Sequence, residues 1–321
     1  MAEKKNGLFP KCTQWYLSGR SALQAIIAEL GDIRSVSLPS WCCDSMVKPF
    51  AEVGVNINFY KAAVENNALV QKIEYDSDVL FLMDYFGYTA PAPDVSGFKG
   101  IIIRDVTHSI FSASYSDADY YFGSLRKWCG VWTAGYAWTN DGHPLPIKQN
   151  DDLGYTLLRD KAMQLKNSYI HGLGVTDKGY LQFFDEAEEI LEKVGIVSAA
   201  DRDVMLASKL DVEYIRQRRR VNAEVLRSAF ADWLIFSEKK ESDCPMFVPV
   251  LVPNGKRDEL RRFLISNNIY CPIHWPVSEY HRLTKQEKFL YENELSLVCD
   301  QRYTEDDMRR VVQIIKSFTE E

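Results

Sequence analysis

The chain has 321 residues, of which 46% are hydrophobic and 26% are charged, and its formal net charge is -7. The acidic balance argues against a nucleic-acid-binding surface, which usually needs a basic field. The polar start at residues 1–6 has no signal-peptide pattern, and no apolar run approaches the roughly 20 residues that a membrane helix needs. We therefore expect a globular cytoplasmic protein that binds neither nucleic acid nor a membrane.

The 7 cysteines contain no Cys-x-x-Cys pair, and their number is odd. Neither a disulfide framework nor a zinc cluster is expected, and reduced, mostly buried thiols are the simpler interpretation. His143, His171 and His281 show no ligand spacing, so no metal site is predicted.

Helical and extended segments alternate in the first half of the chain. Apolar residues from Ala22 to Leu30 recur at helical spacing, with Ser18 or Gly19 as a cap and Gly31 as the end. Short apolar strands follow at Ser35–Leu38, Val79–Met83, Ile101–Ile103, Tyr120–Phe122 and Tyr136–Trp138. Such alternation predicts a parallel sheet with helices on both faces.

The second half is helical and rich in charge, as in Asp185–Leu191, and a long amphipathic stretch runs from Asp201 to Phe230. That stretch contains Arg216 and Arg218–Arg220, which form either an anion site or, more often, a solvated helix face. A second α/β pattern follows, with strands at Phe247–Val252 and near Ile269 and helices at Lys256–Ile265 and Glu305–Phe318. We place the boundary between a large domain, residues 1–205, and a small C-terminal domain, residues 206–321.

The start of the first helix, Ser18 to Leu23, is one candidate binding element. Free backbone N–H groups and the helix dipole at such a start can hold a phosphate, and Ser21 can donate its hydroxyl. Most capped helices, however, bind nothing.

An aspartate at a strand end is a second candidate. The apolar run Ile101–Ile103 delivers Asp105 at its C-terminal end, where ligands bind in open α/β sheets. The alternative is an aspartate that caps the next helix.

The third candidate is Lys127, which follows the strand Tyr120–Phe122 and lies three residues after Ser124. A lysine that acts as a Schiff-base nucleophile must lose its proton, and a partly buried, apolar site favours this. A single lysine in a turn is more often a surface residue.

In this order, the three elements resemble fold-type I enzymes that use pyridoxal phosphate (PLP), and most closely the DegT/DnrJ/EryC1/StrS aminotransferases. The resemblance extends over most of the chain and includes Gly19–Leu23, Leu38–Cys42, Asp84–Gly87, Asp105–His108, Ser124–Trp128, Tyr270–Pro276 and Asp300–Met308. It implies an α/β fold in which the large, cofactor-binding domain has a mainly parallel seven-stranded sheet between helices.

The resemblance also implies a role for each site residue. Lys127 would bind PLP as a Schiff base and then move a proton, and Asp105 would pair with the pyridinium nitrogen. His108 would lie near the cofactor's phenolic oxygen. Ser124 would hold the phosphate together with the helix start at Arg20, Ser21 and Ala22.

Trp41 and Cys42 fall in the segment that lies over the cofactor ring in this family. The position of the usual stacking aromatic falls at Cys43, so either Trp41 stacks on the ring or the ring face is covered differently. The nearest match to the family's Gly-Tyr-Asn-Tyr-Arg stretch is Gly179–Phe183, which lacks the asparagine that reaches a neighbouring subunit. A homodimer is still expected.

Two further side chains have open interpretations. His274, beside Trp275, either lines the substrate entrance or is a buried structural histidine. Arg302 either binds the carboxylate of the amino donor or, as we favour, forms a structural salt bridge.

We expect a PLP-dependent aminotransferase that moves an amino group from an amino acid donor to a carbonyl acceptor, such as a nucleotide-linked keto-sugar. The alternatives are a PLP-dependent lyase or dehydratase, and a non-catalytic relative of the family. Family dehydratases typically replace the lysine, so the presence of Lys127 favours transamination.

Overall fold

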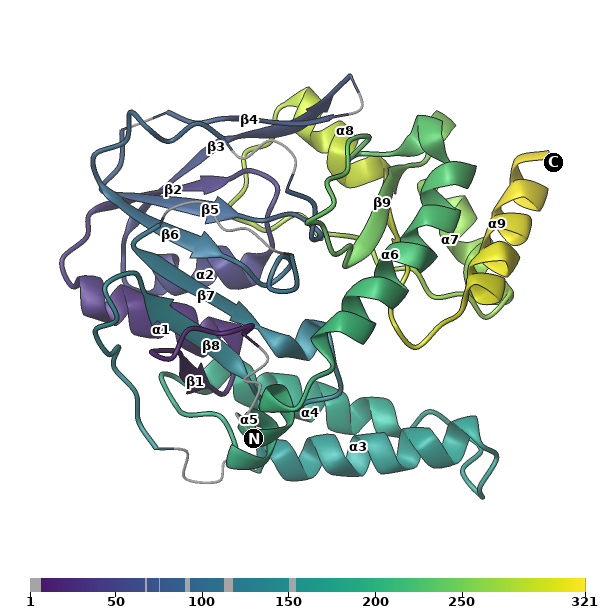
Figure 1. Cartoon of the computed structure of the whole chain (residues 1–321), viewed down its shortest axis with the longest axis horizontal. Helices are drawn as coiled ribbons and strands as arrows, with labels where there is room; N and C mark the ends of the chain where they lie inside the picture. Colours follow the sequence, from purple (N-terminus) through teal and green to yellow (C-terminus); the bar gives the residue numbers. More distant parts are fainter. Residues whose placement is uncertain are drawn as a thin grey trace. The chain divides into compact units, whose positions relative to one another are not determined.

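The computed structural model describes residues 7–66, 68–74, 76–89, 93–112, 118–149 and 154–320. The polar start at residues 1–6, on which the signal-peptide prediction rests, lies outside this part. The chain forms two compact units, whose helices and strands are labelled in Figure 1. Unit 1 comprises Met1–Phe9, Asp32–Tyr121 and Asp211–Glu321, and unit 2 comprises Pro10–Gly31 and Phe122–Leu210.

Unit 1 begins with a mostly parallel set of strands in the order β6-β5-β2-β3-β4. Only β4 runs antiparallel to its neighbour, β3. The central strand β5 reads Val-Leu-Phe-Leu-Met and is buried throughout, as expected of a parallel strand covered on both faces. The elements are β2 (Ser35–Pro39), α2 (Asp44–Glu52), β3 (Asn56–Glu65), β4 (Ala68–Lys72), β5 (Val79–Met83) and β6 (Ile101–Asp105).

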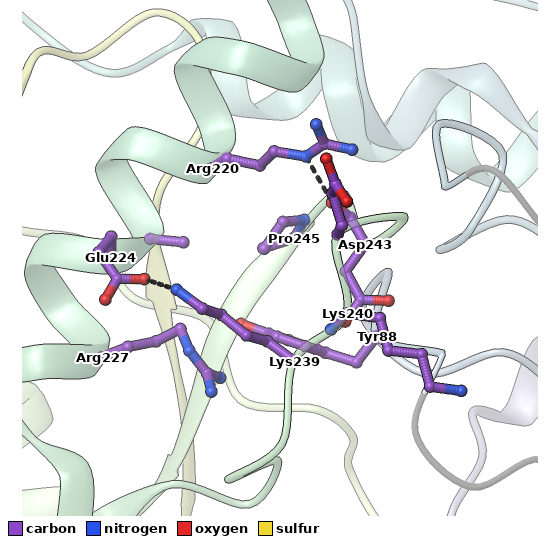
Figure 2. A pocket seen from close by; sticks show the side chains of 10 residues that line it. Tyr88, Arg220, Glu224, Arg227, Lys239, Lys240, Asp243 and Pro245 are labelled. Carbon is purple, nitrogen blue, oxygen red and sulfur yellow. Dashed lines mark hydrogen bonds and ion pairs between the residues drawn. The ribbon is translucent and has the colours of Figure 1, made fainter.

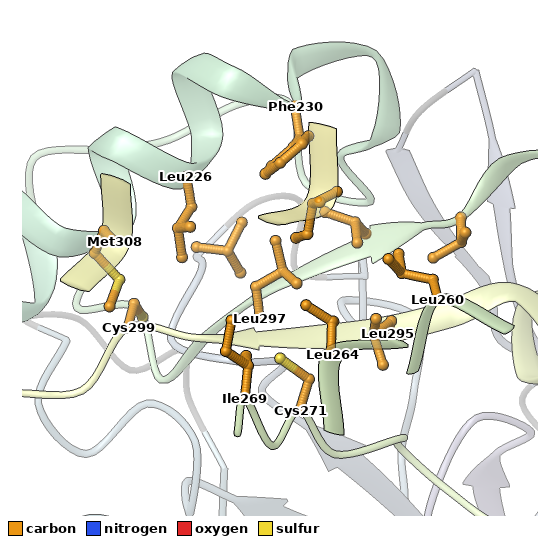
Figure 3. Packing of buried hydrophobic residues seen from close by; sticks show 14 of the residues in the cluster. Leu226, Phe230, Leu260, Leu264, Ile269, Cys271, Leu295, Leu297, Cys299 and Met308 are labelled. Atoms are coloured by element: carbon orange, nitrogen blue, oxygen red, sulfur yellow. The ribbon is translucent and has the colours of Figure 1, made fainter. Parts of the chain in front are cut away.

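The C-terminal part of unit 1 is a second α/β layer around an antiparallel pair, β9 and β10. Its core joins Leu226 of α6 and Phe230, the residue after this helix, to Leu264 of α7, Leu297 of β10 and Met308 of α9 (Figure 3). The elements are α6 (Val212–Ala229), η2 (Ala231–Trp233), β9 (Phe247–Leu251), η3 (Pro253–Gly255), α7 (Arg257–Ser266), α8 (Lys285–Asn293), β10 (Glu294–Val298) and α9 (Glu305–Glu320).

Unit 2 contains the strand order β1-β8-β7, in which β1 is antiparallel to β8. Helices α3 and α4 pack together through rings such as Tyr169 and Tyr180, whose centroids are 5.7 Å apart. The elements are β1 (Gln14–Tyr16), α1 (Gly19–Leu30), β7 (Tyr120–Ser124), η1 (Leu125–Lys127), β8 (Gly135–Thr139), α3 (Tyr155–Ile170), α4 (Tyr180–Lys193) and α5 (Asp201–Ser208). Strand β7 contains the passage from unit 1 to unit 2.

The prediction of an α/β fold with a mainly parallel sheet and a C-terminal α/β layer is confirmed. Eight strands, β1 to β8, precede Asn140 among the described residues, whereas seven were predicted for the sheet. The division of the chain at residue 205 stays a prediction.

The amphipathic stretch Asp201–Phe230 consists of two helices, because Asp211 starts the second one by accepting the N–H of Tyr214 at 3.0 Å. The predicted strand near Ile269 was wrong. The strand that pairs with β9 is β10 and not a strand near Ile269, which follows α7 without regular structure. No described helix is long and apolar enough to cross a membrane.

Candidate functional site

The start of α1 in unit 2 is capped as the sequence predicted. Ser18 Oγ accepts the backbone N–H of Ser21 at 3.1 Å, and the Ser18 carbonyl accepts that of Ala22 at 3.1 Å. The backbone N–H groups of Gly19 and Arg20 have no acceptor within the helix, because no helical turn precedes them. These two donors are therefore available to an anion.

Arg20 adds a cation to this helix start. Its Nη1 atom is buried and has no hydrogen-bond partner among the described residues. Buried N–H groups are nearly always paired in proteins, so an unpaired guanidinium nitrogen indicates a missing acceptor. A phosphate oxygen is the acceptor that this group would bind most strongly.

Ser124 lies beside the same helix start. A Cβ added to Gly19 would lie 3.3 Å from Ser124 Cβ and 3.4 Å from the Gly123 carbonyl oxygen. Strand β8 also approaches closely, since a Cβ on Gly135 would lie 2.0 Å from the Ser18 carbonyl oxygen. Glycine at 19 and 135 is thus what lets β7, β8 and α1 meet at this point.

Lys127 ends the short helix η1 that follows Ser124, between the buried residues Leu125 and Trp128. Lys127 itself is exposed. The role of Lys127 as a Schiff-base lysine stays a prediction. The turn holds its backbone against the core and directs the lysine side chain outward.

Asp105 and His108 form a compact turn at the end of β6 in unit 1. Asp105 is 2% exposed, and its Oδ1 atom accepts the N–H of Thr107 at 2.7 Å. The aspartate therefore orders the turn that carries His108, and no helix starts there.

The ring of His108 has a defined tautomer. The backbone N–H of Phe86 donates to His108 Nδ1 at 3.3 Å, so Nδ1 is unprotonated and the neutral ring has its proton on Nε2. A donor at Nε2 is what a phenolic oxygen of the predicted cofactor requires. Hydrogen positions follow here from the hydrogen-bond pattern.

An aromatic cluster surrounds His108. Trp275 stacks on it with ring centroids 5.9 Å apart and an angle of 15°, and Phe86 lies 5.0 Å away. Phe86 has a positive φ of 53°, a conformation that is uncommon for a bulky residue and that concentrates at functional sites. The next residue, Gly87, has φ of 82° and no room for a Cβ, which would lie 1.9 Å from the Cys244 carbonyl oxygen.

Trp41 is fully buried after β2, where it stacks on Tyr85 with centroids 4.9 Å apart and contacts Phe86 at 5.5 Å. Its Nε1–H donates to the His274 carbonyl at 2.8 Å. Since β2 and β6 run parallel through β5, Trp41 and Asp105 lie at the same edge of the unit 1 strands. The role of Trp41 as the residue that covers a cofactor ring stays a prediction.

Cys42 is buried, and its Sγ lies 3.6 Å from Nε2 of His281. Burial raises the pKa of the Cys42 thiol well above its ordinary value and lowers the pKa of His281. This pair is therefore a neutral thiol and a neutral imidazole, which suits packing better than nucleophilic chemistry. The structure describes all seven cysteines, and none of them forms a disulfide.

The predicted site residues thus form two groups, one in each unit. Arg20, Ser21, Ala22, Ser124 and Lys127 belong to unit 2, and Trp41, Cys42, Asp105 and His108 belong to unit 1. The sequence analysis missed Phe86 as a site neighbour. Its position in an Asp-Tyr-Phe-Gly run, after a buried strand and before a glycine, is the signal that could have indicated it.

Arg302 and the arginines of α6 bond mainly within the protein. Arg302 pairs with Asp300, with Nε 3.1 Å from both carboxylate oxygens, which is the structural salt bridge that we favoured. The arginines of α6 are not a solvated face. Arg216 donates to the Phe111 carbonyl at 2.6 Å, and the buried Arg219 donates to the Met246 carbonyl at 2.8 Å.

Arg220 lines a pocket of about 330 Å³ between α6 and the loop 239–245, apart from the predicted site residues (Figure 2). Most polar groups of this pocket bond within the protein. Asp243 accepts the Thr89 hydroxyl at 2.6 Å, Arg220 Nε donates to the Asp243 carbonyl at 2.7 Å, and Lys239 pairs with Glu224. These bonds fasten the loop to the helix.

Several solved structures that are similar to this chain are aminotransferases. A DegT DnrJ EryC1 StrS aminotransferase from Brucella abortus is similar over 95% of this chain and 85% of its own, with a TM-score of 0.61 and 16% identity. A proposed sugar aminotransferase from Streptococcus pneumoniae in its PLP form is similar over 100% of this chain and 92% of its own, with a TM-score of 0.65 and 16% identity.

A third structure, S. venezuelae DesV in complex with a ketimine intermediate, is similar over 100% of this chain and 90% of its own, with a TM-score of 0.64 and 15% identity. No family model and no curated protein sequence matches the chain. The chain therefore has the fold of the DegT/DnrJ/EryC1/StrS aminotransferases, as its sequence predicted.

Proposed function

We propose that this protein is a PLP-dependent aminotransferase that moves an amino group from an amino acid donor to a carbonyl acceptor, such as a nucleotide-linked keto-sugar. One observation carries the proposal. The start of α1, where the buried Nη1 of Arg20 has no partner among the described residues, adjoins Ser124, and Lys127 follows three residues later. A phosphate site next to a reactive lysine is what a PLP enzyme needs.

The unit 2 residues fit the phosphate and the aldehyde of PLP. Arg20, the backbone N–H groups of the first turn and the hydroxyls of Ser21 and Ser124 are all donors, which matches a dianionic phosphate. Ala22 extends the same turn without obstructing it. Lys127 would attach covalently to the cofactor and, once released, would move the proton at the substrate carbon with its free amine.

The unit 1 residues fit the ring. Asp105 would hold a proton at the ring nitrogen, and the Nε2–H of His108 would donate to the phenolic oxygen. Trp41 and Cys42 would belong to the segment over the ring. When bound, PLP withdraws electrons from the carbon that loses its proton, and a protonated ring nitrogen strengthens this effect.

The donor, acceptor and assembly belong to the same proposal. The similar solved structures include sugar aminotransferases, which supports a keto-sugar acceptor. We further propose that the protein acts as a homodimer in the cytoplasm. Size-exclusion chromatography with light scattering tests the assembly.

The first experiment is reconstitution of the full chain with PLP. The protein should become yellow, and borohydride should fix the cofactor to the peptide that contains Lys127. Lys127→Ala should abolish the fixation, whereas Lys99→Ala, which changes another exposed lysine, should not. A chain that remains colourless with added PLP would leave only the non-catalytic alternative.

The second experiment separates the reactions. Glutamate or glutamine should convert bound PLP to its amine form, and this form should then be consumed by one member of a panel of keto-sugar nucleotides and keto acids. β-Elimination products without conversion to the amine form would instead establish a lyase.

A further inference from the structure

Glu294, the first residue of β10, is fully buried and forms two hydrogen bonds near His274. Ser296 Oγ lies 2.5 Å from Glu294 Oε1, and the backbone N–H of His274 donates to Glu294 Oε2 at 2.7 Å. The same Ser296 Oγ lies 2.8 Å from Nδ1 of the His274 ring. A continuous chain of hydrogen bonds thus joins a buried carboxyl group to one face of an imidazole.

The backbone keeps this chain in place. The N–H of Ser296 donates to the Pro272 carbonyl at 3.0 Å, which fastens the segment around His274 to β10. Because Glu294 Oε2 accepts the His274 backbone N–H, Oε1 is the oxygen that faces Ser296 and can exchange a proton with its hydroxyl. The three side chains therefore have a fixed order, Glu294 then Ser296 then His274.

The protons in this chain can be arranged in two ways. When Glu294 is ionised, the Ser296 hydroxyl donates to Oε1, so His274 Nδ1 must carry the proton that binds Ser296. When Glu294 is protonated, Oε1–H donates to Ser296, the Ser296 hydroxyl turns to Nδ1, and the proton of the neutral ring is on Nε2. The ring nitrogen remote from Ser296 is an acceptor in the first state and a donor in the second.

We propose that Glu294 and Ser296 are positioning residues that set which ring nitrogen of His274 carries the proton, so that His274 is a hydrogen-bond donor at Nε2 when Glu294 is neutral. In this proposal, the buried Glu294 and Ser296 decide whether His274 can donate a hydrogen bond near the residues predicted to bind the cofactor. The His274 ring lies 6.2 Å from His108 and 5.1 Å from Phe86, with centroids as end points.

Burial favours the neutral form of Glu294 at neutral pH, although the polar and charged groups around its carboxyl group favour the ionised form. Burial raises its pKa from the ordinary 4.5 to about 8, against the opposing effects of Ser296, the His274 N–H and Arg257. Arg257 of α7 bonds the Glu294 carbonyl and not its carboxyl group, with Nη1 to O at 3.1 Å. Among the described residues, His274 and Cys271 are also titratable neighbours of Glu294, and the Cys271 thiol is neutral because burial raises its pKa to about 12.

The direct test is NMR of the full chain labelled with 15N-histidine, because protonated and unprotonated ring nitrogens differ widely in chemical shift. The chain has 5 histidines, so His274→Gln assigns the signal by its disappearance. In the wild type, Nε2 should carry the proton well below pH 8, and Nδ1 should carry it well above. The partly exposed His143 is the internal control, since it bonds Asp141 and lies outside this chain of hydrogen bonds.

Two variants make the test sharper. Glu294→Gln should hold the Nε2–H form at every pH at which the ring is neutral, because its amide donates to Ser296 as a protonated carboxyl does. Ser296→Ala should uncouple the ring from Glu294 and remove the pH-dependent change. A His274 signal that keeps one tautomer across this range in the wild type, or that changes in Glu294→Gln as in the wild type, would overturn the proposal.

The consequence for turnover rests on the proposed aminotransferase function. In that case the KM for the carbonyl acceptor should rise above about pH 8 in the wild type and stay constant in Glu294→Gln, with kcat changed less than twofold in the variant. The NMR measurement needs no cofactor. A chain that binds no PLP would therefore refute the proposed function while the tautomer result stands, and an unchanged tautomer in an active enzyme would refute only the inference.

Discussion

Replacing Arg20 by methionine tests the phosphate site. The replacement should not destabilise the cofactor-free protein, but it should weaken the binding of PLP. Methionine keeps much of the length of the side chain and removes the buried Nη1 that has no partner among the described residues. An unpaired buried donor costs about 1–3 kcal/mol, so its removal should leave the free energy of unfolding of the cofactor-free protein unchanged or increase it. If Arg20 had a purely structural role, its replacement would instead lower the free energy of unfolding of the cofactor-free protein.

The loaded protein should respond in the opposite direction. A hydrogen bond to a charged group contributes about 1.5–3 kcal/mol, and about 1.4 kcal/mol corresponds to a tenfold change in affinity. Arg20→Met should therefore weaken PLP binding by about 10- to 150-fold. Pyridoxal, which lacks the phosphate, should bind the variant and the wild type equally.

Absorbance titrations with PLP and pyridoxal give both affinities, and urea unfolding gives the stability. Arg34→Met is the matched control, because the Arg34 side chain is 89% exposed and pairs only loosely with Asp78 at 3.7 Å. Pyridoxal binding that weakens as much as PLP binding would show that Arg20 supports the site in general and does not bind phosphate.

Three further changes test the rest of the site. Asp105→Ala should weaken PLP binding and nearly abolish turnover, and unchanged activity would rule out its role at the ring nitrogen. Gly135→Ala places a Cβ 2.0 Å from the Ser18 carbonyl oxygen, so it should cost about 1–3 kcal/mol in urea unfolding and weaken PLP binding. Gly130→Ala, with nothing within 4 Å, should do neither. Burial raises the pKa of Glu294 from 4.5 to about 8, so between these pH values the folded protein holds a proton that the unfolded chain releases. The free energy of unfolding should therefore fall as the pH rises through this range, by up to about 1.4 kcal/mol per pH unit. Glu294→Gln should lack this slope, and parallel stability curves for the two proteins would contradict the buried carboxyl's neutral state.

Helix α1 and strand β5 were predictable because each is specified by its own residues. The spacing from Ala22 to Leu30 buries one helix face, and Val79–Met83 is apolar at every position. Strand β10 was not predicted, since Glu294 and Ser296 make it read as polar. Their burial depends on the bonds to His274, about 20 residues earlier, and such pairing is decided by tertiary contacts.

The same distinction holds for the site. The residue types that could bind PLP were predictable from local motifs, because a capped helix start, a strand-end aspartate and a lysine turn are local features. The exposure of Lys127 and the stacking of Trp275 on His108 were not, because they depend on how distant segments pack. The arginines of α6 were misread for this reason too, since their acceptors are backbone carbonyls such as those of Phe111 and Met246.

The unpaired nitrogen of Arg20 needs to be weighed against others in the described part of the chain. Arg104, Arg126 and Arg159 also have a buried nitrogen without a hydrogen-bond partner. Each of them, however, forms an ion pair through another nitrogen, to Asp84 at 2.6 Å for Arg104 and to Glu188 at 2.5 Å and 3.4 Å for the other two. For Arg20 no carboxylate of the described residues lies within ion-pair distance. A partly buried guanidinium without a counter-charge is costly unless an anion joins it. Its position on the first turn of α1, next to Ser124, is where the helix dipole also favours an anion. The lack of an anionic partner for Arg20 is therefore better explained by a ligand phosphate than by packing. Comparing the binding of PLP and pyridoxal to Arg20→Met can refute this explanation.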